Sequence, residues 1–140
     1  MSAEVVVSFA VPFVRGKARP RFARATGHAY TPDATIEAME RLRVAYMAES
    51  GGRSAPAGTP VSVTITTARG MPRSRPKRLE QEPDVYKPDA DNVAKLVLDA
   101  LNRVAWADDT QVTSLHVRKF PRDRVADEQT HVIVSWEEDE

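Results

Sequence analysis

The chain has 140 residues, no cysteine, 41% hydrophobic residues and equal numbers of basic and acidic residues, 20 of each. This length suits one domain with a hydrophobic core, and the apolar content excludes a disordered chain. The lack of cysteine excludes disulfides, thiolate nucleophiles and cysteine-based zinc sites. We find no signal peptide and no apolar run near about 18 residues, so we expect a soluble, cytoplasmic protein that does not span a membrane.

The neutral total conceals an uneven distribution of charge. Residues 1–80 hold 13 Lys/Arg and 6 Asp/Glu, a net +7, whereas residues 81–140 hold 7 and 14, a net −7. Such asymmetry favours basic segments that hold a polyanion and acidic segments that hold a metal. A mixed-charge surface without either role is the open alternative.

The first 50 residues predict a strand, a basic loop and a helix. Apolar residues alternate over 5–11, as in a strand, and the basic run over 15–24 contains the glycine and proline of an exposed loop. Thr31-Pro32-Asp33 is typical of a helix start, with the threonine as cap. We expect this helix to end near Glu49. The residues expected to face inward are Ile36, Met39, Leu42 and Tyr46.

The middle of the chain predicts two loops around a second strand. Residues 50–60 are rich in Gly, Ser, Ala and Pro, which indicates a connecting loop. Alternation over 61–66 predicts a strand. The basic run over 71–78 contains two prolines, which argue against regular structure there.

The last third predicts a helix and two strands. Apolar residues recur with helical spacing over 92–103, and Asp91 is the expected cap of this helix. Residues 111–120 and 130–136 are expected to be strands. The acidic residues 137–140 are expected to form a frayed tail beyond a domain of residues 1–136. The order β-α-β-α-β-β predicts a single mixed α/β (α+β) domain, with two main helices packed on one mixed sheet.

Acidic residues gather around the second predicted helix. Asp89 and Asp91 stand two residues apart, and extended backbone at a helix start can turn both to one side. Asp91 and Lys95 lie one turn apart on the face opposite the apolar residues, and Asp108-Asp109 follow the helix. Carboxylates at this density repel one another unless a cation neutralises them. Because Mg²⁺ binds through carboxylates, water and substrate phosphates, this pattern predicts metal-assisted phosphoryl chemistry.

A purely structural explanation of the same residues is also open. Asp91 can cap the helix and pair with Lys95, and Asp108-Asp109 can form a turn. A helix of about 12 residues is about 18 Å long. Asp109 therefore meets Asp89 only if the chain returns along the helix, and the sequence leaves this open.

Other catalytic sites lack their motifs. His28, His116 and His131 are scattered without the spacing of a zinc site, and no Walker-type loop or G-x-S-x-G turn is present. Trp106 is expected to be an anchor of the core or of a turn.

One block of residues resembles a known family. Lys87-Pro88-Asp89-Ala90-Asp91-Asn92, then Lys95, Leu98-Asp99-Ala100-Leu101-Asn102 and Trp106-Ala107-Asp108-Asp109-Thr110-Gln111-Val112 resemble the signature of the RusA family of Holliday junction resolvases. Softer matches are Gly16-Lys17-Ala18-Arg19-Pro20-Arg21, Tyr30-Thr31-Pro32 and the second basic loop. The resemblance covers most of the chain. Ala90 stands where the family usually has a larger apolar residue.

The resemblance implies a dimeric endonuclease that depends on Mg²⁺, or alternatively Mn²⁺, and cuts four-way DNA junctions in recombination and repair. It implies metal binding by Asp89, Asp91 and Asp109, with Lys95 as a further catalytic residue. It also implies a bacterial or phage-encoded protein. We expect the basic loops to contact DNA phosphates. The residues expected to do so are Lys17, Arg19, Arg21, Arg73, Arg75, Lys77 and Arg78.

Two other functions stay open. A nuclease with the same chemistry can prefer flaps or forks to four-way junctions. A non-catalytic DNA-binding protein would need the aspartates only as helix caps, and would show no dependence on Mg²⁺.

Overall fold

A mixed four-stranded sheet forms the centre of the fold. The computed structural model describes residues 2–18 and 21–139, without the side chains of Arg21, Phe22 and Tyr30. The strand order is β1-β8-β4-β6, in which β4 and β6 are parallel and the other neighbours are antiparallel. The strands are β1 (Ser2–Val11), β4 (Val61–Ala68), β6 (Val112–Lys119) and β8 (Gln129–Asp139).

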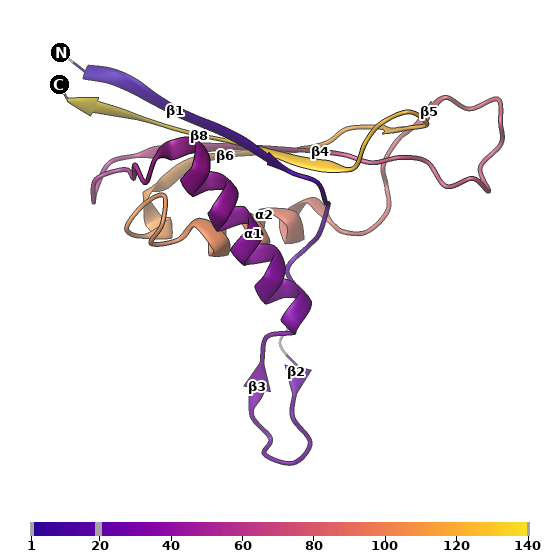
Figure 1. Cartoon of the computed structure of the whole chain (residues 1–140), viewed down its shortest axis with the longest axis horizontal. Helices are drawn as coiled ribbons and strands as arrows, with labels where there is room; N and C mark the ends of the chain where they lie inside the picture. Colours follow the sequence, from indigo (N-terminus) through magenta and orange to yellow (C-terminus); the bar gives the residue numbers. More distant parts are fainter. Residues whose placement is uncertain (1, 19–20, 140) are drawn as a thin grey trace.

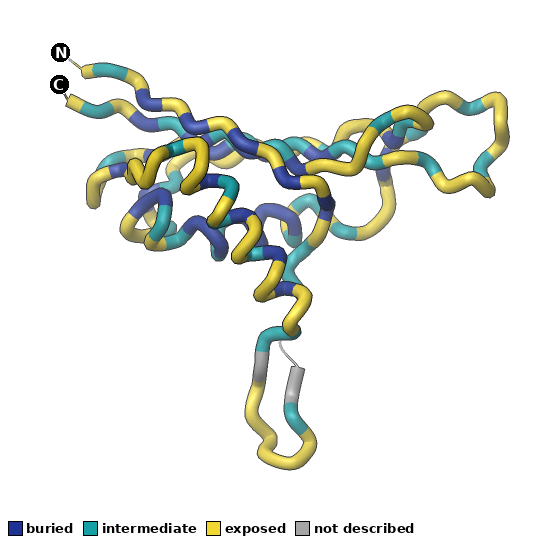
Figure 2. Tube along the Cα trace, in the orientation of Figure 1, coloured by how far each residue is buried: buried dark blue, intermediate teal, exposed yellow. Residues whose placement is uncertain are grey.

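Two helices, α1 (Asp33–Ser50) and α2 (Ala90–Leu101), cover one face of this sheet (Figure 1). The fold is therefore the predicted α+β domain, and the order of its main elements, β1-α1-β4-α2-β6-β8, confirms the prediction. Strand side chains alternate between the two faces. Buried and exposed residues accordingly alternate along β1 and β4, with one side toward the helices and the other toward solvent (Figure 2).

The core lies between the sheet and the helices. α2 contributes most to it, because Val93, Leu96, Val97 and Leu101 are each at most 2% exposed. α1 contributes Leu42 and Tyr46, which are fully buried, and the ring of Tyr46 meets Phe9 of β1 edge to face, with centroids 5.9 Å apart. Trp106, just beyond α2, is 1% exposed and is a core anchor, as predicted.

Two projections extend from this layered core (Figure 1). The first is a hairpin of β2 (Arg21–Phe22) and β3 (Ala29–Tyr30), located where the sequence predicted only a loop. The second, which we call the arm, consists of residues 69–82 and 120–128. Within the arm β5 (Gln81–Glu82) pairs with β7 (Arg122–Asp123). Most of both projections is exposed (Figure 2).

The start of α1 differs from the prediction. Pro32 is extended, with φ −56° and ψ 143°, and is itself the cap, so Thr31 does not cap the helix. The helix turns a slightly different face inward, and its buried residues are Thr35, Ala38, Leu42 and Tyr46. The prediction for Ile36 is wrong, because this residue is 48% exposed. Met39 is half-buried and packs against the core.

Two further boundaries also differ. α2 begins at Ala90 with Asp89 as its cap, so Asp91 lies inside the first turn rather than before it. The acidic end of the chain is not frayed up to Asp139, because β8 continues there in register with Ser2, Ala3 and Glu4 of β1. Backbone pairing with the first strand thus orders a segment that has no apolar pattern of its own. The two ends of the chain lie side by side (Figure 1).

Within the described residues, neither helix combines the length and apolarity that a membrane-spanning segment requires.

The packing of α1 on the sheet predicts a large difference between two of its aliphatic positions. Leu42→Ala, at a fully buried position, should lower the free energy of unfolding by about 2–5 kcal/mol, because it leaves a cavity in the core. Val44→Ala, on the same helix but 66% exposed, should change it by less than about 0.5 kcal/mol. Urea unfolding followed by circular dichroism measures both. Equal losses would contradict the packing of α1 on the sheet.

Candidate active site

The amino end of α2 presents three of the predicted catalytic residues to solvent. Asp89 caps the helix with extended backbone (φ −67°, ψ 152°), and its carbonyl oxygen accepts the N–H groups of Asn92 and Val93. Asp91 and Lys95 follow at exposed positions of the helix. Carboxylates near a helix amino end are stabilised by the free amides and the helix dipole. The apolar face of α2 packs in the core, and its opposite face carries these polar residues.

Each of the two carboxylates lines a depression at this end of the helix. Asp89 lines an open depression together with Gly16, Lys17 and Lys87. Asp91 lines a second, mostly apolar depression with Lys95 of α2 and with Leu115 and Val117 of β6. Each carboxylate thus lies beside a lysine.

Residues 16 and 17 brace this helix end from outside. Gly16 packs so closely that a Cβ atom there would lie 2.9 Å from Cβ of Pro88 and 3.0 Å from Cβ of Asn92. The N–H of Lys17 donates to the carbonyl oxygen of Asn92 at 2.9 Å, and its ammonium group pairs with Asp99, two turns further along α2. A glycine at position 16 lets the backbone approach the helix, and Lys17 then holds it there.

Asp108 and Asp109 lie at the other end of α2. Asp108 caps the short helix η1 (Asp109–Gln111), and the N–H of Thr110 donates to its carboxylate and lowers the pKa of Asp108 below its ordinary value. One carboxylate oxygen of Asp109 accepts the indole N–H of Trp106 at 2.8 Å. Trp106 is bridged to Asn102, directly after the last residue of α2. η1 accordingly lies beside the carboxyl end of the helix (Figure 1).

The carboxylates of one chain fit part of a magnesium site. Asp89 and Asp91 are oxygen donors of the kind that Mg²⁺ prefers, and this ion is often bound by one or two carboxylates, water and substrate phosphate. Within residues 2–18 and 21–139, no group of three or more Asp, Glu, His or Cys side chains is placed to hold a metal ion. Asp109 therefore does not join Asp89 and Asp91 within a single chain.

A buried ion cluster holds the segment that leads into Asp89. The carboxylate of Asp84 is 1% exposed and receives two hydrogen bonds from Arg69, at 2.8 and 3.1 Å. The ammonium group of Lys119 lies 3.9 Å from it and also donates to the carbonyl oxygen of Tyr86. Burial alone would raise the pKa of Asp84, but the hydrogen bonds and charge of Arg69, with Lys119, outweigh it and hold the pKa below its ordinary value.

A second ion cluster continues into the arm. Glu82 accepts hydrogen bonds from Arg75 and Arg122, chiefly the latter, and they lower the pKa of its carboxyl group. The guanidinium carbon of Arg122 lies 3.9 Å from the ring centroid of Tyr86. These contacts join β5, β7 and the chain just before the site. The arm therefore owes its order to ion pairs more than to apolar packing.

The predicted DNA-binding residues divide into two groups. Lys17 and Arg75 are paired with Asp99 and Glu82, so their charges are already neutralised within the fold. Three exposed residues on the arm have no ion pair to another described residue: Arg73, Lys77 and Arg78. Arg19 and the side chain of Arg21 lie outside the described part of the chain.

The cluster around Asp84 was not predicted from the sequence. Arg69, Asp84 and Lys119 lie in different segments, and no motif or periodicity connects them. The prolines and charged residues of the arm are equally typical of a solvated loop, so they gave no signal of a buried ion cluster. Their contacts depend on where β4, β6 and α2 come together.

Comparisons with known proteins identify the family of this chain. The family model of the endodeoxyribonuclease RusA matches residues 12–134, which include both helices, the site and the arm. The chain therefore belongs to the RusA endodeoxyribonuclease family. A similar protein is the uncharacterized protein YqaN of Bacillus subtilis (strain 168), 41% identical over 69 residues, which cover 44% of this chain and 49% of that protein. The chain thus matches about half the length of this relative.

The buried carboxylate of Asp84 predicts a loss of stability that depends on pH. Asp84→Asn should lower the free energy of unfolding at neutral pH by about 3–5 kcal/mol, because Arg69 and Lys119 would lose their buried partner. The pKa of Asp84 is depressed in the folded state, so its contribution is present above the ordinary pKa of 3.8 and is lost as the pH falls through the lower folded value.

Urea unfolding at neutral pH and near pH 3 tests this dependence. The gap between the native protein and Asp84→Asn should narrow at the lower pH. Asp127→Asn, at an exposed position, is the matched control and should have little effect at either pH. A gap that stays constant with pH would show that the ionised Asp84 does not stabilise the fold.

Proposed function

We propose that this protein is an Mg²⁺-dependent endonuclease that cuts four-way DNA junctions by paired nicks on opposing strands. The observation that carries this proposal is the amino end of α2. There Asp89, Asp91 and Lys95 are exposed beside Lys87, on a helix whose opposite face is buried. Membership of the RusA family supports the same activity. A divalent cation at this place would neutralise the phosphate and lower the pKa of the attacking water.

Each residue has a distinct task in this proposal. Asp89 and Asp91 supply oxygen ligands, and the free amides of the helix end favour a phosphate beside them. Lys95 stabilises the charge that develops on the phosphate in the transition state. Lys17, tied to Asp99, fixes the position of the helix end instead of moving to the substrate. The exposed basic residues of the arm grip phosphates away from the cut, which positions DNA without reading its sequence.

A homodimer fits both the substrate and the structure. A four-way junction has approximate two-fold symmetry, so a two-fold dimer places one site at each of two opposing strands. Asp109 lies at the opposite end of α2, about 18 Å away by the length of a 12-residue helix. We propose that Asp109 joins Asp89 and Asp91 only across two copies of the chain.

The first test of the function is cleavage of a synthetic four-way junction with and without Mg²⁺, beside linear duplex and flap substrates. Paired nicks in the junction that require Mg²⁺ support the proposal. Faster cutting of the flap would identify a nuclease of the same chemistry with another substrate. Binding without cleavage under Mg²⁺ or Mn²⁺ would reject the nuclease and leave a DNA-binding protein.

Substitution of the helix-end carboxylates should separate cleavage from binding. Asp89→Asn and Asp91→Asn should each slow junction cleavage at least about a hundredfold, since several kcal/mol of charge stabilisation are lost. Binding measured in EDTA should stay equal or become tighter, because a negative charge near DNA is removed. Asp127→Asn, an exposed carboxylate in the arm, should cut normally. Normal cutting by Asp89→Asn would refute the metal-ligand role.

Mixing two inactive variants tests whether the site spans two chains. Asp89→Asn and Asp109→Asn are refolded together and compared with each alone. If the site spans the dimer, a mixed dimer has one site with both substitutions and one with neither, so single nicks should reappear. If each site lies within one chain, every site carries a substitution and mixing restores nothing. Sedimentation of each sample confirms that dimers have formed.

A further inference from the structure

Two arginines lie on one phenyl ring next to the candidate active site. The guanidinium carbon of Arg15 is 4.9 Å from the ring centroid of Phe13, and that of Arg41 is 5.0 Å from it. Phe13 is part of the core and only 6% exposed, whereas both arginines are exposed. The buried ring therefore holds two cations near each other at the surface, no farther apart than twice these distances.

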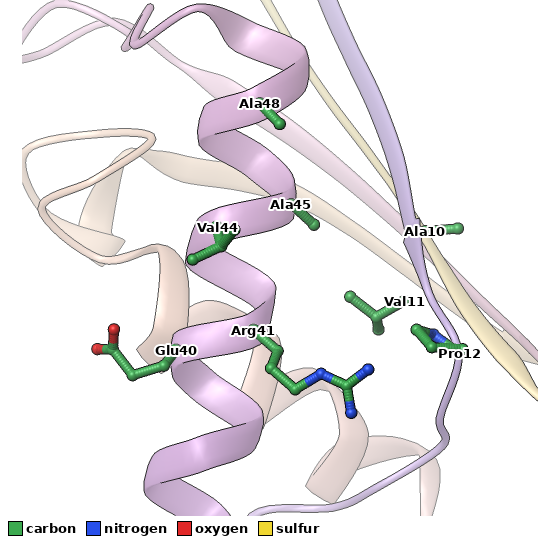
Figure 3. Close-up of a pocket in the computed structure, with 8 residues that line it drawn as sticks. All are labelled: Ala10, Val11, Pro12, Glu40, Arg41, Val44, Ala45 and Ala48. Atoms are coloured by element: carbon green, nitrogen blue, oxygen red, sulfur yellow. The ribbon is translucent and has the colours of Figure 1, made fainter.

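Neither arginine has a carboxylate partner among the described residues. Glu40, the neighbour of Arg41 along α1, points away from it and pairs with Arg43 (Figure 3). Glu128, another carboxylate near this segment, accepts the N–H of Val14 at 3.2 Å and forms no ion pair with either arginine. Two like charges held close without an anion repel each other, and this repulsion is relieved when an anion binds between or across them. The pair thus differs from Lys17 and Arg75, whose charges are neutralised within the fold.

The cation–π contacts prepare both groups for phosphate. A guanidinium that lies over an aromatic ring loses part of its side-chain freedom but keeps its N–H donors, which match phosphate oxygens in pairs. A free surface arginine must be ordered when it binds, at a cost in entropy. Because the ring of Phe13 already orders both side chains, part of this entropy is lost before the anion binds.

The pair lies next to the segment that braces the candidate active site. Arg15 directly precedes Gly16 and Lys17, which lie against the amino end of α2, and it lines a depression with Gly16 and Thr35 of α1. Arg41 extends from α1 toward Pro12 (Figure 3) and lines a groove there with Val11. Arg15 therefore adjoins the residues that brace the active site, and the shared contact with Phe13 links it to Arg41.

We propose that Arg15 and Arg41 form a phosphate clamp, which holds the backbone of one DNA strand as it leaves the active site along α1. The proposal rests on the proposed function for the identity of the strand. Two separate guanidinium groups fit successive phosphates of a polymer better than one small anion. Arg73 and Arg78 belong to the arm, a different part of the surface, so the clamp adds a second grip on the DNA.

The test measures DNA binding without cleavage. A fluorescent four-way junction is titrated in EDTA at several KCl concentrations with the native protein and with the Arg15→Gln/Arg41→Gln variant. The variant should bind on the order of tenfold more weakly, and its plot of log K against log salt should be shallower by about 0.9 for each phosphate that is no longer bound. An unchanged slope overturns the proposal.

Matched variants separate the clamp from net charge and from folding. Arg53→Gln removes an arginine beyond the carboxyl end of α1, where the side chain is 57% exposed and pairs with Glu138, and it should leave the slope unchanged. Arg41→Gln alone, titrated in the same way, should make the slope shallower, and an equal change for Arg53→Gln would overturn the clamp. Phe13→Leu keeps both charges but removes the ring, so it should weaken binding with little change in slope. Thermal unfolding by circular dichroism verifies that each variant is folded.

Two further outcomes distinguish the sources of phosphate and the two proposals. If the native protein and the double variant differ in their affinity for inorganic phosphate but not in the salt slope of junction binding, the pair binds free anions and the strand clamp is rejected. If the slope changes as expected but no junction is cut under Mg²⁺, the clamp is supported and the proposed nuclease activity is rejected. If the native protein cuts the junction under Mg²⁺ and the salt slope of the double variant is unchanged, only the clamp is rejected.

Discussion

The burial of one face of α2 against the sheet is the interaction on which the site depends. Val93, Val97 and Leu101 are held in the core, so the register and tilt of the helix are set by packing. The opposite face then has to carry Asp91 and Lys95 at the surface. The same helix thus contributes to stability and presents the polar residues, and a rigid helix keeps their spacing more constant than a loop would. Gly16 and Lys17 secure its amino end from the outer side.

The basic residues fall into two groups, those paired with a carboxylate within the fold and those without such a partner among the described residues. The arm contains little apolar core of its own, and pairs such as Arg69 with Asp84 and Arg122 with Glu82 replace it. Buried pairs of this kind give modest net stability but are costly to break singly. The equal totals of acidic and basic residues therefore do not exclude a nucleic-acid partner. Binding of a nucleic acid depends instead on the cations that have no carboxylate partner among the described residues, such as Arg15 and Arg41.

The length of α2 is a constraint on assembly. A 12-residue helix separates Asp89 and Asp91 from Asp109, and the indole of Trp106 holds Asp109 at the far end. A single chain therefore offers a pair of carboxylates at one end and a third at the other. Under the proposed function, a second copy in two-fold symmetry is the simplest way to unite them, and the symmetry of a four-way junction matches such a dimer.

Local patterns in the sequence were sufficient for part of this result. The alternation in β1, β4 and β8, the helical spacing of α2 and the cluster of Asp89, Asp91 and Lys95 are properties of neighbouring residues, so the main elements, their order and the candidate catalytic group followed from them. The tertiary structure decided what depends on distant residues. The order of β8 up to Asp139 depends on Ser2, and the burial of Asp84 depends on Arg69 and Lys119. The separation of Asp109 from Asp89, and the meeting of Arg15 and Arg41 on Phe13, follow from the packing of α1 and α2 on one sheet, because only packing brings residues far apart in the chain to a common place.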